Sequence, residues 1–242
     1  MTHPARPAVV IPAYNEATTI RDVVERARAQ LPLVIVVDDG STDGTGDALA
    51  GLDVVLLRNP VNEGKAASLR RGADEALQRG AQAVVTLDGD GQHCPEDIPL
   101  LLGAWREAPD GIVIGSRLHR GSLIPKARYR ANRVANFWIS LAAGYAIADS
   151  QSGFRVYPAR VLREAHVKSD RAHSFVFESE ILIEAARLGV QARCVPVQVV
   201  YGDRARASHF RPVLDIARIV RMVAWRLVSQ GIAQRAACLR RA

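Results

Sequence analysis

The chain reads Ala83-Val84-Val85-Thr86-Leu87 and continues as Asp88-Gly89-Asp90-Gly91-Gln92-His93. The first five residues form an apolar, largely β-branched run that stops at glycines, a pattern typical of a buried strand in a parallel sheet. Ligands of open α/β sheets bind just outside the carboxyl ends of such strands, where Asp88 and Asp90 would emerge. Their oxygens suit Mg²⁺ or Mn²⁺. An isolated Asp-x-Asp is more often an ordinary turn, so the interpretation depends on motifs elsewhere in the chain.

Apolar runs alternate with segments of helical periodicity up to residue 115. The predicted strands cover residues 8–11, 33–37, 54–57, 83–87 and 111–115, and the predicted helices cover residues 17–31, 64–79 and 95–105. Strands that alternate with helices of this length predict a mostly parallel, Rossmann-like α/β sheet flanked by helices.

The regular alternation of predicted strands and helices ends after Ser116. The predicted elements are then a basic loop, a helix over residues 132–145, a polar segment over 149–155, a helix over 177–188, a strand over 194–201 and an amphipathic helix over 213–230. Pro196 cannot donate to a ladder, so we expect its strand at an edge of the sheet. We expect one domain over residues 1–210, followed by the C-terminal amphipathic helix and a basic tail over residues 211–242.

Composition narrows the choice of partners. The 242 residues carry a net charge of +7 with a pI near 9.8, and this length suits one large α/β domain. Basic clusters attract phosphates, anionic lipids or nucleic acid. Because no nucleic-acid motif accompanies them here, we expect no nucleic-acid partner.

The cellular location follows from cysteines and apolar runs. Three cysteines without paired spacing, and an N-terminus without a signal peptide, favour the cytoplasm. The longest uncharged run, residues 134–148, is shorter than the roughly 20 residues of a membrane span. The helix predicted over residues 213–230 fits peripheral attachment to the cytoplasmic membrane face, packing on the domain, or packing on a second subunit of a homodimer.

Three further polar segments follow predicted strand ends at the same edge of the sheet. They are Pro12-Ala13-Tyr14-Asn15-Glu16, Asp38-Asp39-Gly40-Ser41-Thr42-Asp43-Gly44 and Gly64-Lys65. A carboxylate in the second can accept hydrogen bonds from a nucleobase or ribose. Backbone N–H groups and a lysine at a helix start can bind an anion. Each segment alone is more often a turn or a helix cap, but their convergence on one edge predicts a nucleotide site.

The set of motifs resembles the inverting GT-A glycosyltransferases of family 2, and within them the dolichyl-phosphate mannosyltransferase and polyprenyl-phosphate glycosyltransferase branch. Further segments that carry the resemblance are Asn62-Glu63-Gly64-Lys65, Gly115-Ser116-Arg117, Asp149-Ser150-Gln151-Ser152-Gly153-Phe154-Arg155 and Phe177-Glu178-Ser179-Glu180. One feature of the branch is missing, because residues 204–209 lack the Gly and Lys of its usual Gly-x-Ser-Lys stretch.

The resemblance implies a role for each matching residue. The nucleotide sugar would contact Pro12, Tyr14, Glu16, Asp39, Gly64, Lys65, Asp88, Arg117 and Arg204. A Mg²⁺ or Mn²⁺ cofactor on the diphosphate would be held by Asp88, Asp90 and Gln92. The catalytic residues would be Asp90, Arg117, Asp149 and Glu180. Arginines and a divalent ion suit this task because negative charge develops on a departing nucleoside diphosphate.

The implied reaction is metal-dependent, inverting transfer of a hexose from a nucleotide sugar of the GDP-mannose or UDP-glucose type. The expected acceptor is lipid-linked, namely polyprenyl or dolichyl phosphate, which is already an oxyanion and needs no base. A hydroxyl acceptor on a glycan, lipid or small molecule would need one, with Asp149 or Glu180 as candidates. Alternatives of another class are a sugar-phosphate nucleotidyltransferase and a non-catalytic nucleotide-binding module. The segment after the first strand is not the Gly-rich, Lys-ending loop usual in nucleotidyltransferases.

Overall fold

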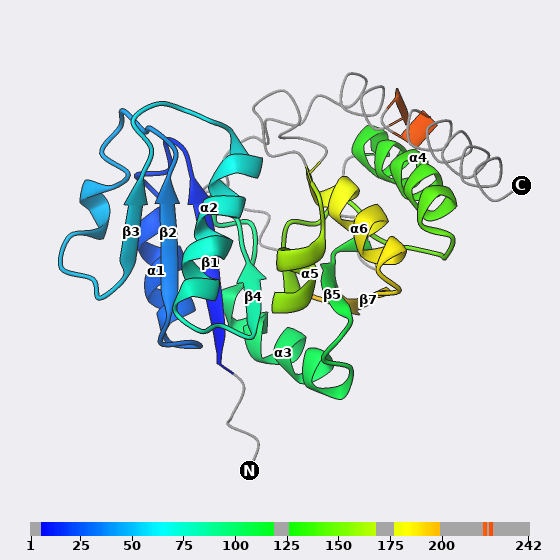
Figure 1. Ribbon diagram of the computed structural model, residues 1–242. Coiled ribbons are helices and arrows are strands. Elements are labelled where there is room, and N and C mark those ends of the chain that lie inside the picture. Colours follow the sequence, from blue (N-terminus) through cyan, green and yellow to red (C-terminus); the bar gives the residue numbers. More distant parts are fainter. Residues whose placement is uncertain (1–5, 119–125, 168–176, 199–219, 222, 225–242) are drawn as a thin grey trace, which may run out of the picture.

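The computed structural model describes residues 6–118, 126–167, 177–198, 220, 221, 223 and 224. In these residues seven strands form one mixed sheet in the order β3-β2-β1-β4-β6-β5-β7 (Figure 1). The strands are β1 (Pro7–Ala13), β2 (Val34–Asp38), β3 (Val55–Arg58), β4 (Ala83–Thr86), β5 (Ile112–Ser116), β6 (Arg155–Pro158) and β7 (Ala192–Pro196). The prediction of a mostly parallel α/β sheet flanked by helices is confirmed.

Strands β1 to β4 form a parallel half, as the continuous apolar runs predict. In register, Val9 of β1 lies opposite Val34 of β2 on one side and Val85 of β4 on the other. All residues of β2 and of β4 are buried. Runs without polar alternation suit this position, because helices cover both faces of a parallel sheet.

Strand β6 was not predicted, and it runs antiparallel to both of its neighbours, β4 and β5. Its four residues are too few and too mixed to give a strand pattern, since a charged residue opens it and a proline closes it. Strand β7 pairs in parallel with β5 at the edge, so the edge prediction for Pro196 is confirmed. The strand spans residues 192–196, and residues 199–201 of the predicted strand lie outside the described ranges.

The sheet separates two apolar cores because alternate strand residues point to opposite faces. The helices are α1 (Ile20–Arg28), α2 (Lys65–Gln78), α3 (Ile98–Glu107), α4 (Lys126–Ala143), α5 (Ala159–Glu164) and α6 (Phe177–Arg187). Helices α1 and α3 pack on one face, where Val9 and Val85 lie in the same cluster as Ile20 and Leu101. Helices α2, α4, α5 and α6 pack on the other face. The result is a three-layer α/β/α arrangement.

The observed helix boundaries differ from the predicted ones where turns precede a helix or a glycine ends it. A turn over residues 16–19 delays the start of α1 to Ile20, and residues 95–97 form a 3₁₀ turn before α3. Helix α4 begins six residues before the predicted start at residue 132 and ends before Gly144, whose φ of +78° is left-handed. Glycine adopts this conformation without steric cost, which suits a helix end.

Little of the predicted helix over residues 213–230 is described. Residues 220, 221, 223 and 224 are helical, with Val223 fully buried in the core that contains α2, α4 and α6, and Arg221 exposed. The predicted domain boundary at residue 210 lies outside the described residues. Nowhere in the described ranges does a helix combine the length and apolar character that crossing a bilayer requires.

Candidate active site

The predicted site residues come from loops at the carboxyl ends of the parallel strands. Strands β1, β2 and β4 end at Ala13, Asp38 and Thr86, next to one another in the sheet (Figure 1). The loops that follow them therefore meet at one edge, which is where α/β proteins bind ligands.

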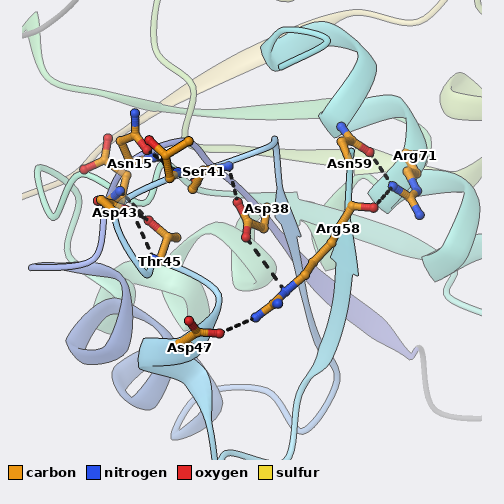
Figure 2. A network of polar contacts seen from close by, with 11 residues as sticks. Asn15, Asp38, Ser41, Asp43, Thr45, Asp47, Arg58, Asn59 and Arg71 are labelled. Carbon is orange, nitrogen blue, oxygen red and sulfur yellow. Dashed lines mark hydrogen bonds and ion pairs between the residues drawn. The ribbon is translucent and has the colours of Figure 1, made fainter. Parts of the chain in front are cut away.

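The loop after β1 is bonded to the loop after β2 (Figure 2). The Asn15 backbone N–H donates to Ser41 Oγ at 2.9 Å, and the Thr42 N–H donates to Asn15 Oδ1 at 2.9 Å. The Glu16 N–H donates to Thr45 Oγ1 at 2.8 Å. Asn15 has a φ of +56°, a left-handed conformation that asparagine tolerates better than most residues. These bonds fix the predicted nucleotide residues Tyr14 and Glu16 against the second loop, and 40% of Tyr14 is exposed.

Thr19 connects the first loop to the Asp88–Asp90 segment. Its hydroxyl donates to the Gly89 carbonyl at 2.7 Å. A Cβ atom at Gly89 would lie 3.2 Å from Ile20 and 3.5 Å from the Pro12 carbonyl oxygen. The glycine therefore lets the segment that carries both aspartates approach β1 closely.

Asp39 is buried, and its carboxylate binds its own chain. It accepts hydrogen bonds from Asn59 Nδ2 at 2.8 Å and from the backbone N–H groups of Glu63 and Gly64 at 2.9 and 2.8 Å. These contacts fix the segment that leads into α2. The contact of Asp39 with a nucleotide stays a prediction, and its position beside Gly64 is compatible with it.

Lys65, the first residue of α2, lies between two carboxylates. Its Nζ atom is 2.7 Å from Asp88 Oδ1 and 2.8 Å from Glu178 Oε1 of α6. Burial alone would raise the pKa of Asp88, but the Lys65 charge, followed by those of His93 and Arg117, lowers this pKa to about 2. Burial would lower the pKa of Lys65, yet the two carboxylates raise it above its ordinary value. Asp88 and Lys65 are therefore ionised together.

Gly153 lies directly against this ion pair. A Cβ atom there would be 2.9 Å from Asp88 Oδ2 and 3.0 Å from Lys65 Nζ, which is tighter than ordinary van der Waals contact. A side chain at residue 153 would therefore require Asp88 or Lys65 to shift from the geometry of the ion pair. Thr86 holds the segment that enters β6 there by donating from Oγ1 to the Gly153 carbonyl at 2.7 Å.

Asp90 and Gln92 form the second part of the cluster. The Gln92 N–H donates to Asp90 Oδ1 at 3.0 Å, and Arg117 Nη1 donates to Gln92 Oε1 at 3.3 Å. Burial, and then the charge of Asp88, raise the pKa of Asp90. Two neighbouring carboxylates repel each other when both are ionised, and a divalent cation between them would relieve that repulsion. Such cations favour hard oxygen ligands. The described residues contain no cluster of three His, Cys, Asp or Glu side chains, so such an ion would also need Gln92, water or substrate oxygens.

Asp149 is buried beside the end of β5. Its Oδ2 atom accepts from Ser116 Oγ at 3.1 Å and from the Arg117 N–H at 3.2 Å. The carboxylate therefore fixes the backbone of Arg117, whose guanidinium contacts Gln92. Its role as a base stays a prediction.

Two residues of this region were not predicted as site residues. One is Glu178, the second partner of Lys65. The other is Arg155, which is fully buried and donates to the carbonyls of Ser150, Ser152 and Glu178 at 2.8, 2.7 and 2.6 Å. Both stand in the motifs that carry the family resemblance, which is the signal that could have singled them out.

The contacts connect Lys65, Asp88, Asp90, Gln92, Arg117 and Asp149 in one region. Glu180 is buried on α6, the helix that also carries Glu178. Arg204 lies outside the described residues. The roles assigned to all of these side chains remain predictions.

Comparison with known proteins gives a match to a family. The model of the family described as "Glycosyl transferase family 2" matches residues 8–165. An undecaprenyl-phosphate mannosyltransferase of Micrococcus luteus is 30% identical over 235 residues, covering 93% of this chain and 96% of the relative. A polyprenol monophosphomannose synthase of Mycolicibacterium smegmatis is 32% identical over 203 residues, covering 79% of this chain and 76% of the relative. A UDP-N-acetylglucosamine–dolichyl-phosphate N-acetylglucosaminyltransferase of Methanococcus voltae is 29% identical, covering 82% of this chain and 87% of the relative.

Solved structures share the fold. Glucosyl-3-phosphoglycerate synthase from Mycobacterium tuberculosis, crystallised with Mn²⁺, UDP and glucosyl-3-phosphoglycerate, superposes with a TM-score of 0.67 at 22% identity. The match covers 93% of this chain and 79% of that one. The mixed sheet described above is therefore the GT-A fold.

Proposed function

The chain belongs to glycosyl transferase family 2 and is a glycosyltransferase, and we propose that it transfers a hexose from a nucleotide sugar to a polyprenyl phosphate with inversion at the anomeric carbon. Two of the relatives above are named for undecaprenyl or dolichyl phosphate and the third for polyprenol monophosphomannose, and the sugars named are mannose in two and N-acetylglucosamine in one. Their names support the acceptor more strongly than any one donor. The donor is a GDP-mannose-type or UDP-glucose-type sugar in this proposal.

One observation carries the assignment of the donor site. Asp88, Asp90, Gln92 and Arg117 lie in one contact group at the carboxyl edge of the sheet. Asp88, Asp90 and Gln92 would hold Mg²⁺ or Mn²⁺ on the donor diphosphate. The ion would supply positive charge to the departing nucleoside diphosphate.

Arg117 would assist the same departure. Its guanidinium is held at Gln92 and its backbone at Asp149, so its charge is positioned before the substrate binds. Such preorganised charge stabilises a transition state without reorganisation during the reaction. As the leaving group departs, a phosphate oxygen of the acceptor forms the new bond to the anomeric carbon from the opposite side.

The engagement of Asp149 supports a phosphate acceptor over a hydroxyl acceptor. Its Oδ2 atom already accepts two hydrogen bonds, from Ser116 and Arg117, so this oxygen is engaged in fixing the end of β5. A phosphate oxyanion needs no general base, so the reaction can proceed with Asp149 in this structural role.

Donor and acceptor can be tested in one assay. Purified protein with Mn²⁺ would be given GDP-mannose, UDP-glucose or UDP-N-acetylglucosamine, each with undecaprenyl phosphate or with a hydroxyl acceptor such as a simple alkyl glycoside. Asp90→Asn serves as the inactive control. Sugar transfer to the phosphate supports the proposal, and faster transfer to the hydroxyl acceptor contradicts it. Release of pyrophosphate from a nucleoside triphosphate and a sugar phosphate would instead indicate a nucleotidyltransferase.

A further inference from the structure

Helix α4 presents an apolar stripe to the solvent. Val134, Phe137 and Leu141 are 43%, 63% and 52% exposed. Their spacing of three and four residues places them on one side of the helix. The other exposed large hydrophobic side chains of the described residues stand singly on other elements, as Leu100 does on α3. A run of three on one helix face is a candidate interaction surface.

The opposite side of α4 is packed against the domain. Ala135 and Ile139 are buried in the core that contains α2 and α6. Between them, Asn136 Oδ1 accepts from the Ser150 N–H at 2.9 Å and from Ser150 Oγ at 2.7 Å. The stripe is therefore on a helix that is packed on its other side and hydrogen-bonded to Ser150, the residue next to Asp149.

The charge around the stripe has one sign. Residues 111–148 contain no Asp or Glu, and their charged side chains are Arg117, Arg120, Lys126, Arg128, Arg130 and Arg133. Arg130 and Arg133 are exposed on α4 itself. An apolar stripe beside basic residues fits a surface that combines hydrocarbon with negative charge, as an anionic lipid bilayer does.

We propose that the face of α4 carrying Val134, Phe137 and Leu141 docks the protein on an anionic lipid bilayer. Charge argues against a second copy of the chain, because in a symmetric dimer through this face the two basic surfaces would repel each other. Val223 of the C-terminal segment is buried in the same core as Ala135 and Ile139 of α4, and the stripe is exposed with that residue in place.

Docking through α4 also places the site next to the membrane. The residue after Asn136 in the chain is Phe137, so one helix turn contacts both the loop of Asp149 and the bilayer. This consequence rests on the proposed function, because it brings the phosphate of a membrane lipid toward Arg117 and Asp149. Figure 1 shows α4 at the end of the molecule opposite β3.

The test is binding of the full chain to vesicles. Sedimentation would compare vesicles of equal parts phosphatidylglycerol and phosphatidylcholine with vesicles of phosphatidylcholine alone, at low and high salt. We expect binding to the anionic vesicles that falls as salt rises, because screening weakens attraction to the surface. Phe137→Ser/Leu141→Ser should bind about tenfold more weakly. Both side chains are more than half exposed, so this variant should fold.

Leu100→Ser is the matched control, since it removes an exposed leucine from a different helix. It should bind vesicles as the unaltered protein does. Equal binding by the double variant would overturn the docking surface, as would failure of the unaltered protein to bind any vesicle. If the double variant instead converted a dimer into a monomer in sedimentation velocity, the face would be a contact between copies and the proposal would be wrong.

A water-soluble, short-chain prenyl phosphate separates this inference from the proposed function. The double variant should turn it over at the unaltered rate while losing activity toward polyprenyl phosphate in vesicles. If the unaltered protein uses the soluble acceptor but ignores vesicles, only the docking inference fails. If it binds vesicles through α4 but transfers to no prenyl phosphate, only the proposed function fails.

Discussion

Lys65 Nζ lies 2.7 Å from Asp88 Oδ1 and holds that carboxylate in its ionised form. The same ammonium contacts Glu178 at 2.8 Å, so one side chain joins α2, the loop after β4 and α6. Segments far apart in the sequence are thus tied together at the candidate site.

Replacing Lys65 by Met should destabilise the protein by about 1–3 kcal/mol, because Asp88 and Glu178 would be left facing each other without a cation. The free energy of unfolding would be measured in urea. A double-mutant cycle with Glu178→Gln isolates the interaction between Lys65 and Glu178. Side chains in one network couple by roughly 0.5–3 kcal/mol. Strictly additive effects would show that the two side chains do not interact in solution.

The stability of the metal-free protein should depend on the Lys65–Asp88 pair in acid. The pKa of Asp88 is lowered from 3.8 to about 2, so its contribution is fully present above pH 3.8 and is lost as the pH falls toward 2. The difference in unfolding free energy between the unaltered protein and Lys65→Met should therefore shrink over this window. Measurement in urea with a chelator present checks this, and a difference independent of pH contradicts it.

Asp90→Asn should separate stability from function. Burial and the charge of Asp88 raise the pKa of Asp90, so a neutral side chain removes an unfavourable charge while its Oδ1 can still accept from Gln92. The metal-free melting temperature should be equal or higher. Stabilisation by Mn²⁺ with the donor nucleotide should disappear, since a charged ligand is lost. Unchanged stabilisation by these ligands would remove Asp90 from the metal site.

Arg117→Ala should mainly lower turnover. Loss of one preorganised donor to a developing negative charge costs about 10²–10³ in rate in comparable sites. Steady-state kinetics with the donor that proves active in the transfer assay would measure it, and Arg106→Ala, a change of an exposed arginine on α3, is the control. A loss of less than about threefold would place Arg117 outside the catalytic group.

Arg155→Met should be severely destabilising, because the carbonyls of Ser150, Ser152 and Glu178 would lose their buried donor. Each unsatisfied buried group costs about 1–3 kcal/mol. Arg155→Lys should recover only part of the loss, since an ammonium does not reproduce the planar fork of a guanidinium. Denaturant unfolding of both variants checks this, and a cost of less than 1 kcal/mol for Met would contradict it.

The parallel half of the fold follows from sequence because its strands contain continuous apolar runs and are followed by polar loops. Strand β6 does not, because its position depends on pairing with β4 and β5 rather than on its own pattern. Burial of Arg155 could not be predicted from the local sequence either, since it requires backbone carbonyls that only the folded loop brings together.

The site was predictable to the extent that it consists of loops at strand ends. Residues such as Asp88 and Asp90 follow a recognisable strand, and the topology brings them to one edge. The contact of Lys65 with Glu178 depends on how α6 packs, which local sequence does not specify. Likewise, nothing local to Asp39 indicates that its carboxylate would bind residues 59–64.

Because β6 runs in the opposite direction, it contributes a different kind of loop to the site. Strands β1, β2, β4 and β5 present the loops by which the chain leaves them, whereas β6 presents the loop by which the chain enters it, residues 149–154. A change in the length of an exit loop shifts the start of the element that follows it. An entry loop is anchored downstream by a strand already paired on both sides, so substitutions in it can reshape the edge without displacing a crossover helix.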